Sequence, residues 1–346
     1  MTEIESPPSE QCLIELLVQV REETVVATTV GRGQLARQLA DTMPHSSVRC
    51  WGIDAYQSAL AMRQADYPTN LQFVCQPDIP EVDFDVAMIP LRRTGDAELA
   101  RDVLQSAYKS LKIGGRLITA IDNTTDRWLA VETRKLSRHV KRNPVAKGTV
   151  YVVSKKESVR KDRAFDCELA FRDAGRLLRL FTRPGVFAHR KLDVGARQLL
   201  NSINAKPGSK IIEIGCGSGA VSIGLAARDP NARVLAIDSN ARAVQCTSRN
   251  AELNGLTNIL AEIGFDGIFG SAGEFDLAVA NPPYYSDYRI AELFVFAANR
   301  ALRPGGRMVL VTKSSEWYLE HLPLNFSDVE SKSSGQYQIV FGTKKS

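Results

Sequence analysis

The chain has 346 residues, of which 44% are hydrophobic and 24% charged, which is typical of a soluble globular protein long enough for two domains. No apolar run approaches the roughly 20 residues of a membrane-spanning helix. The acidic, proline-containing start MTEIESPPSE lacks the pattern of a signal peptide, so we expect a cytoplasmic protein with no membrane partner. The six cysteines form no CxxC pair and only four histidines accompany them, which argues against a structural metal or a disulfide framework.

The net charge of +5 is unevenly distributed along the chain. Residues 134–191, here called the basic belt, hold 17 Lys or Arg against 5 Asp or Glu, a balance of +12 that leaves −7 for the rest. Such a belt can attract a phosphate backbone by releasing counterions, with a steep salt dependence. A solvated linker and helix surface explains the same charges equally well.

Helical and strand-like patterns alternate from Glu10 to about Val153. The expected helices cover residues 13–20, 31–39, 55–64 and 98–111, and the expected strands cover 24–30, 49–53, 72–75, 84–89, 116–121 and 149–154. Strands that alternate with helices in this way predict a parallel sheet covered on both faces.

A charged connection over 155–167 and a segment over 169–193 with a Pro-Gly turn precede a second alternation. Part of that segment, 185–193, could form a lid over a site or serve as a simple linker between domains. The expected helices of the second half cover 196–203, 220–228, 241–254 and 290–302, and the expected strands cover 210–214, 233–237, 258–263, 275–280 and 307–312, with a hairpin-like pair near 326–330 and 336–341.

The two halves repeat one pattern. Gly31, Gly33 and Asp54 are matched, 184 residues later, by Gly215, Gly217 and Asp238. The set Phe84, Asp85, Gly114 and Gly115 is matched, 191 residues later, by Phe275, Asp276, Gly305 and Gly306. One seven-residue insertion reconciles the two offsets, so we infer an internal duplication of one α/β domain.

The differences between the two halves predict one catalytically active domain and one inactive domain. Thr29 stands where the second half has Glu213, Leu35 where it has Gly219, and Pro90-Leu91-Arg92 where it has Asn281-Pro282-Pro283. We therefore expect a structural or RNA-holding domain without a cofactor over residues 1–155, a basic linker and lid segment over 156–192, and a catalytic domain over 193–346.

A glycine-rich loop lies between a predicted strand and a predicted helix, where glycines permit positive φ and let the backbone approach a ligand. It comprises Glu213, Gly215, Cys216, Gly217 and Gly219 with the residues between them. This pattern fits a nucleotide or S-adenosylmethionine (AdoMet), and it also resembles the dinucleotide fingerprint, which alone is weak evidence.

Two acidic residues follow the next two strands. Asp238, followed by Ser239, ends the strand after the glycine loop and suits hydrogen bonding to ribose hydroxyls with either cofactor. Asp266 follows the third strand and could accept the amino group of an adenine, although a plain loop explains it almost as well.

An apolar strand runs directly into Asn281, Pro282, Pro283 and Tyr284. The prolines lack an N–H and cannot continue a ladder, so the strand must stop at Asn281. Open α/β sheets bind ligands at the carboxyl ends of their strands, so we expect the Asn281 amide and the neighbouring carbonyls in the crevice, beside the aromatic face of Tyr284.

This acceptor loop suits methylation of a planar amine. Oxygens of Asn281 and Pro282 can hold both N–H groups and direct the lone pair at a methyl donor, so that positioning and electrostatics replace an acid or base. A dehydrogenase needs a proton-transfer residue here, so the loop favours AdoMet over a dinucleotide, with no metal. An ordinary Asn-Pro-Pro turn is the structural alternative.

Together EIGCGSG, Asp238 and NPPY resemble the class I AdoMet-dependent methyltransferases that modify nitrogen in planar groups. GVFAHRKLDVGARQLL and the degenerate upstream copy are more closely similar to the ribosomal RNA guanine-N2 methyltransferases of the small-subunit type, strongly from Gly185 to Thr312 and weakly before Lys155. The resemblance implies two tandem Rossmann-like domains, each a mostly parallel sheet with an antiparallel last strand, of which the first is silent.

The resemblance also implies roles for particular residues. Asn281 to Tyr284 would hold the guanine amine, Glu213 to Gly219 with Asp238 would hold AdoMet, and Phe187 and Asp193 would close over it. This chain departs from the family in carrying Tyr284 and Tyr285 where Phe and His are common. Ribosomal RNA or a ribosomal subunit is the implied partner, and we expect a monomer.

Three alternative functions stay open. One is methylation of a glutamine amide in a protein, because NPPY also occurs in the release-factor glutamine methyltransferases. Another is methylation of the N6 amine of adenine in DNA or RNA. The basic belt and the duplicated domain favour RNA over a protein loop. A non-catalytic RNA-binding or assembly module is an alternative from another class, against which the intact glycines and NPPY argue.

Overall fold

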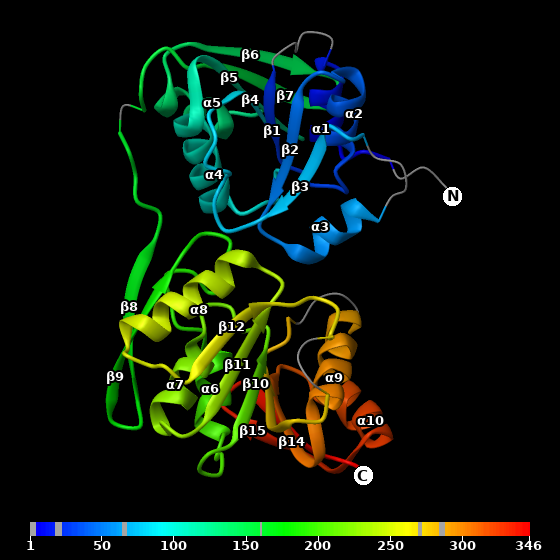
Figure 1. Ribbon diagram of the computed structural model, residues 1–346, viewed down its shortest axis with the longest axis vertical. Helices are drawn as coiled ribbons and strands as arrows, with labels where there is room; N and C mark the ends of the chain where they lie inside the picture. Colours follow the sequence, from blue (N-terminus) through cyan, green and yellow to red (C-terminus); the bar gives the residue numbers. More distant parts are fainter. Residues whose placement is uncertain (1–4, 18–22, 64–67, 160, 269–271, 284–287) are drawn as a thin grey trace. The chain divides into compact units, whose positions relative to one another are not determined.

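The computed structural model describes residues 5–17, 23–63, 68–159, 161–268, 272–283 and 288–346. The chain divides into two compact units, Met1–Phe165 and Asp166–Ser346, here called the first and second units (Figure 1). Residues 166–192, expected as part of a linker and lid segment, thus belong to the second unit and contain a β-hairpin. No described helix is long and apolar enough to cross a membrane.

The first unit begins with a short helix and then alternates strands and helices. Its elements are α1 (Pro8–Ile14), β1 (Thr24–Ala27), α2 (Gln34–Thr42), β2 (Ser47–Gly52), α3 (Ala55–Met62), β3 (Leu71–Cys75), β4 (Phe84–Leu91), α4 (Ala97–Ser110), β5 (Leu111–Ile121), α5 (Trp128–Leu136), β6 (Val140–Val145) and β7 (Gly148–Ser154).

The second unit opens with a hairpin and then repeats the same succession. Its elements are β8 (Cys167–Asp173), β9 (Arg176–Thr182), α6 (Val194–Ser202), β10 (Lys210–Ile214), α7 (Ala220–Arg228), β11 (Arg233–Asp238), α8 (Ala241–Leu253), β12 (Ile259–Ile263), β13 (Phe275–Ala280), α9 (Arg289–Ala301), β14 (Leu302–Thr312), α10 (Glu316–His321), a 3-10 turn η2 (Leu322–Leu324), β15 (Phe326–Ser334) and β16 (Tyr337–Lys344).

The two large sheets have the same strand order. It is β3-β2-β1-β4-β5-β7-β6 in the first unit and β12-β11-β10-β13-β14-β16-β15 in the second. The first five strands of each order pair in parallel, whereas β7 and β6, like β16 and β15, are antiparallel to their neighbours. This confirms the predicted tandem α/β domains with mostly parallel sheets and antiparallel final strands.

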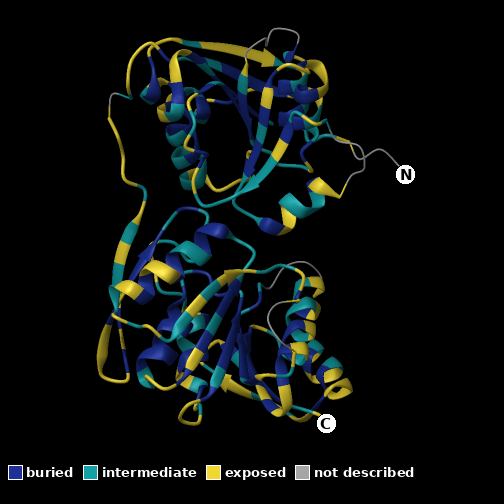
Figure 2. Cartoon of the chain, in the orientation of Figure 1, coloured by how far each residue is buried: buried dark blue, intermediate teal, exposed yellow. Residues whose placement is uncertain are grey.

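Each sheet has a core on both faces because successive strand residues point to opposite sides. Val25 packs with the α1 and α2 side of the first sheet, whereas the adjacent Val26 packs with the α4 and α5 side. In the second unit Ile211 and Ile212 divide in the same way between the α6–α7 side and the α9 side. Figure 2 shows the central strands as the most buried parts of both units.

Several expected boundaries differ from the structure. The first helix begins at Pro8 rather than 13, and positions 18–20 lie outside the described residues. Strand β5 begins at Leu111, five residues before the expected start, because the chain turns extended directly after α4 and passes an irregular stretch with Gly114 at φ 93°. Patterns for α5, β6 and the hairpin β8–β9 were not recognised in the sequence.

Candidate functional site

The candidate site lies at the carboxyl edge of the second sheet. Ile214 of β10 pairs with Ile237 of β11 on one side and with Ala280 of β13 on the other. These three strands are parallel, so the segments that follow them leave the sheet at the same edge. The glycine loop, Asp238 and Asn281 are therefore neighbours in space, as the sequence pattern predicted.

The glycine loop has the backbone that its sequence requires. Gly215, Gly217 and Gly219 have φ of 75°, 56° and 77°, the left-handed region that disfavours any residue with a Cβ. A Cβ at Gly215 would lie 2.7 Å from the Phe294 ring, and one at Gly219 would lie 2.6 Å from Thr247 Oγ1. The loop is therefore closely enclosed at Gly215 and Gly219, where no side chain can be accommodated.

Asp238 fixes the shape of this loop. Its Oδ2 accepts a hydrogen bond from Gly217 N at 2.8 Å, and its Oδ1 accepts one from Asn240 N at 2.9 Å. Gly264 N donates to the Asp238 carbonyl at 3.0 Å, which brings the segment after β12 to the same place. The adjacent Ser239 is half-buried between β11 and α8. Asp238 thus joins the glycine loop, the start of α8 and the segment that follows β12.

Glu213 acts through α7 rather than at the surface of the loop. Its carboxylate is 3% exposed and accepts hydrogen bonds from the backbone N and the hydroxyl of Ser222, in the first turn of the helix. Burial raises the pKa of Glu213 to about 8, although the bonds from Ser222 partly oppose this. Such a carboxylate anchors the helix N-terminus, whose amides otherwise lack partners.

Asn281 is held by Asp193, 88 residues earlier in the chain. Asn281 Nδ2 donates to Asp193 Oδ2 at 2.8 Å, and both side chains are half-buried. The same carboxylate oxygen caps α6 by accepting from Ala196 N at 2.8 Å. Because an amide group is planar, this bond also determines where the Asn281 oxygen points. Two predicted site residues are therefore brought into direct contact.

The segment between β9 and α6 lies against the glycine loop. A Cβ added at Gly217 would lie 3.8 Å from Phe187 Cβ, and the Phe187 side chain is 62% exposed. Asn240 Nδ2 donates to the carbonyl of Gly185 at 2.7 Å, and the buried Arg242 donates to the carbonyl of Pro184 at 2.9 Å. These bonds tie the segment to the start of α8.

The remaining predicted residues have different surroundings. Cys216 is buried, its Sγ lies 3.4 Å from Thr247 Oγ1, and burial raises its pKa well above 9.0, so the thiol is not set up as a nucleophile. Asp266 is exposed and accepts from Ile268 N at 2.9 Å, which forms a local turn. Pro282 is buried and Pro283 half-buried directly after β13, whereas Tyr284 lies outside the described residues.

Three residues that shape the site are not indicated by the sequence pattern. Phe294 and Thr247 enclose the glycine loop from α9 and α8, and Arg242 anchors the segment before α6 although its side chain is only 1% exposed. Arg242 stands in the first turn of a helix, where an arginine normally faces solvent. The helical spacing alone therefore carried no signal that it would be buried.

The corresponding loop of the first unit is filled by a side chain. Glu10 of α1 is fully buried, and its carboxylate accepts from Thr29 Oγ1 and from the backbone N of Val30, Gly31 and Leu35 at 2.6 to 3.2 Å. These amides belong to the loop that matches the glycine loop of the second unit. A carboxylate of the chain itself thus occupies donors that would otherwise face a ligand.

Comparison with known proteins matches this arrangement to one family. The model of the "Methyltransferase small domain" matches residues 177–341. A ribosomal RNA small subunit methyltransferase C from Pseudomonas aeruginosa (strain LESB58) is 35% identical over 151 residues, 42% of this chain and 44% of that protein. In this match the chain spans less than half the length of the relative.

A longer match comes from Pseudomonas entomophila (strain L48). Its ribosomal RNA small subunit methyltransferase C is 30% identical over 258 residues, which cover 71% of this chain and 74% of that protein. Among solved structures, a T. thermophilus 16S rRNA N2 methyltransferase in complex with AdoMet and guanosine shares the fold, with a TM-score of 0.77 and 21% identity over 96% of this chain and 92% of that one. The chain therefore belongs to the ribosomal RNA small subunit methyltransferase C family.

Proposed function

We propose that the second unit transfers the methyl group of AdoMet to the exocyclic N2 amine of a guanine in ribosomal RNA. The observation that carries the proposal is the bond from Asn281 to Asp193, which orients a planar amide beside the glycine loop. Family relatives named for small-subunit ribosomal RNA, and a protein of the same fold bound to AdoMet and guanosine, support the same substrate.

The loop residues fit AdoMet. Three glycines with positive φ leave a concave backbone, and an acidic residue ends the neighbouring strand. When bound, AdoMet supplies a methyl group on a positively charged sulfur. We assign its contacts to the segment 213–219 with Cys216, to Asp238 and Ser239, and to Asp266, with Phe187 and Asp193 covering it. Glu213 contributes through the first turn of α7.

The acceptor is positioned without an acid or base. The lone pair of an NH2 conjugated to a ring is delocalised, so the amine must be oriented before it can attack. In the proposed mechanism the Asn281 amide oxygen and the Pro282 carbonyl accept its two N–H groups, and Pro283 keeps the turn rigid. Stacking on Tyr284 is part of the proposal and is worth roughly 1–3 kcal/mol per base.

Basic side chains of the second unit suit an RNA partner. Arg172, Arg176 and Arg179 are exposed on the hairpin β8–β9, within the basic belt. Contacts of such side chains with phosphates release counterions and weaken as salt rises. We propose that the second unit carries catalysis, that the first has a structural or RNA-holding role, and that the protein acts as a monomer in the cytoplasm on ribosomal RNA or a ribosomal subunit.

Transfer of a tritium-labelled methyl group tests the proposal. The chain is incubated with labelled AdoMet and, separately, with small ribosomal subunits, free ribosomal RNA or release factor, and labelled nucleosides are then identified. We expect N2-methylguanosine from an RNA substrate, lost in Asn281→Ala with AdoMet affinity retained. Asn231→Ala, in an exposed loop, is the matched control. Label in release factor or in adenine would refute the guanine assignment.

A further inference from the structure

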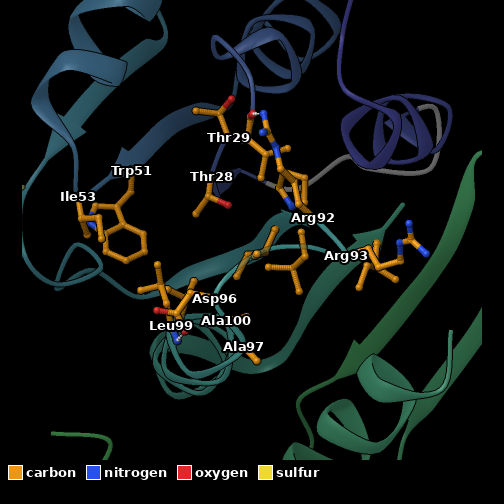
Figure 3. A pocket seen from close by; sticks show the side chains of 18 of the residues that line it. Thr28, Thr29, Trp51, Ile53, Arg92, Arg93, Asp96, Ala97, Leu99 and Ala100 are labelled. Carbon is orange, nitrogen blue, oxygen red and sulfur yellow. Dashed lines mark hydrogen bonds between the residues drawn. The ribbon is translucent and has the colours of Figure 1, made fainter. Parts of the chain in front are cut away.

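The first unit contains a cavity of about 380 Å³ at the carboxyl ends of β1, β2 and β4, beside the start of α4 (Figure 3). Most of its lining is apolar, and two of the chain's three tryptophans, Trp51 and Trp128, contribute to it. The Trp51 ring is held in place because its Nε1 donates to the Gln76 carbonyl at 3.0 Å. Three exposed polar residues, Arg92, Arg93 and Asp96, also line it.

One difference in side-chain size between the two units contributes to this space. Val103 lines the cavity from α4, and 191 residues later α9 carries Phe294. In the second unit the Phe294 ring reaches the turn after β10, where a Cβ at Gly215 would meet it at 2.7 Å. Valine lacks the ring that would fill the matching volume in the first unit.

In position, the cavity corresponds to the proposed base-binding site beside Asn281 in the second unit, rather than to the glycine loop of that unit. Gly31 and Gly33 do not line it, and the loop amides around them are bonded to Glu10. Residues 90–93, which match Asn281 and the positions after it, form one wall. The first unit has therefore kept a pocket where the second unit is proposed to take a base, without the methylating groups.

We propose that this cavity binds a purine nucleotide, with the base against the half-buried Trp128 indole and the phosphate at Arg92 and Arg93. The volume lies in the range of small-molecule pockets, and aromatic side chains are the usual platforms for nucleobases. Arg92 donates to the Val30 carbonyl, which fixes its guanidinium at the pocket, and a guanidinium with five N–H groups can also bind phosphate. The nucleotide could come from an RNA strand or from solution.

Tryptophan fluorescence tests the proposal directly. In the Trp317→Phe background of the full chain, both remaining tryptophans line the cavity. Guanosine and adenosine monophosphates should quench their emission saturably, whereas ribose 5-phosphate and inorganic phosphate should have no effect at the same concentrations. Absence of saturable quenching by both purine nucleotides would overturn the proposal.

Variants show whether the quenching arises from the cavity. Val103→Phe introduces the residue of the second unit, and Ala100→Phe fills the lining from another position on α4. Both should abolish the quenching, with folding confirmed by circular dichroism. Quenching that persists in both folded variants would refute the site.

The phosphate contact is tested separately. Arg92→Ala should weaken binding of the monophosphates about tenfold but not of the nucleosides. Arg138→Ala, an exposed arginine outside the lining, is the control.

Methyl transfer to ribosomal RNA then distinguishes the two sources of the nucleotide. If the occupant is part of an RNA strand, Val103→Phe should raise KM for RNA about fivefold or more with kcat unchanged. If it is a free nucleotide, KM should stay constant while quenching by monophosphates is lost. The choice of an RNA strand rests on the proposed function, but the fluorescence test needs neither AdoMet nor catalysis, so the two proposals can fail separately.

Discussion

Asn281 Nδ2 donates a hydrogen bond to Asp193 Oδ2 at 2.8 Å, across 88 residues of sequence. The same oxygen caps α6 through Ala196 N. One carboxylate thus performs two tasks, ending the segment that passes the glycine loop and orienting the amide at the end of β13. The position of the acceptor amide is therefore coupled to the start of α6.

Replacing Asp193 should separate these two tasks. Asp193→Ala removes both, and we expect kcat for methyl transfer to fall about 10- to 100-fold, with about 1 kcal/mol of stability lost with the helix cap. Asp193→Ser keeps a capping oxygen but is too short to hold Asn281. In this variant kcat should fall while the stability of the protein is retained. Asp193→Asn retains an acceptor for both and should recover most of the activity. Wild-type kcat in the serine variant would show that the contact has no positioning role.

Gly219→Ala should damage the loop more than backbone strain alone explains. Gly219 and Gly255 have φ of 77° and 65°, so alanine at either position costs roughly 1 kcal/mol or more. A Cβ at Gly219 would also meet Thr247 at 2.6 Å, whereas one at Gly255 has no heavy atom within 4 Å. We expect AdoMet affinity, measured by calorimetry, to fall at least about tenfold in Gly219→Ala only. Equal effects of the two variants would contradict the close packing of the loop.

The buried Glu213 should make stability depend on pH. Its pKa of about 8 lies above the ordinary value of 4.5, so folding favours the protonated carboxyl between these values. Its contribution is present in full below pH 4.5 and is lost as pH rises towards 8, by at most about 1.4 kcal/mol per pH unit. Glu213→Gln cannot titrate, so the variant should gain stability relative to wild type between pH 5.5 and 8.5 in urea unfolding. Parallel pH profiles for the two proteins would contradict the raised pKa.

Glu10 should stabilise the first unit without affecting AdoMet binding. Glu10→Ala removes the carboxylate that accepts from four donors of the loop, of which Gly31 N keeps a second bond to Thr29 Oγ1, and we expect about 2–5 kcal/mol of destabilisation in urea unfolding. Glu15→Ala, exposed one residue after the same helix, should cost under about 0.5 kcal/mol. AdoMet affinity should match wild type in both. A large loss of affinity in Glu10→Ala would contradict the assignment of the cofactor to the second unit.

The best-predicted elements have strong local signals. Strands β10 and β13 and helix α7 match their expected bounds because each is a short apolar run bounded by glycine or proline. The hairpin β8–β9 was missed because its alternating apolar residues are interleaved with the arginines of the basic belt, which obscured the period of two. Gly114 lies between the expected helix 98–111 and the expected strand 116–121, but in the structure it belongs to β5.

The site was predictable in outline but not in its contacts. Strand order brings the glycine loop, Asp238 and Asn281 to one edge, which the alternation of strands and helices indicates. The bond between Asn281 and Asp193 depends on how α6 packs, and the burial of Arg242 depends on the path of the preceding segment. Neither follows from local sequence, because both contacts join residues far apart in the chain.

Nucleoside mass spectrometry of ribosomal RNA tests the central claim most directly. Small-subunit RNA is isolated from cells that carry wild type, Asn281→Ala or Asn231→Ala in place of the native gene. We predict that one N2-methylguanosine is present at wild-type level with Asn231→Ala and absent with Asn281→Ala. Full methylation of that guanine in cells carrying Asn281→Ala, at comparable protein levels, would contradict the account.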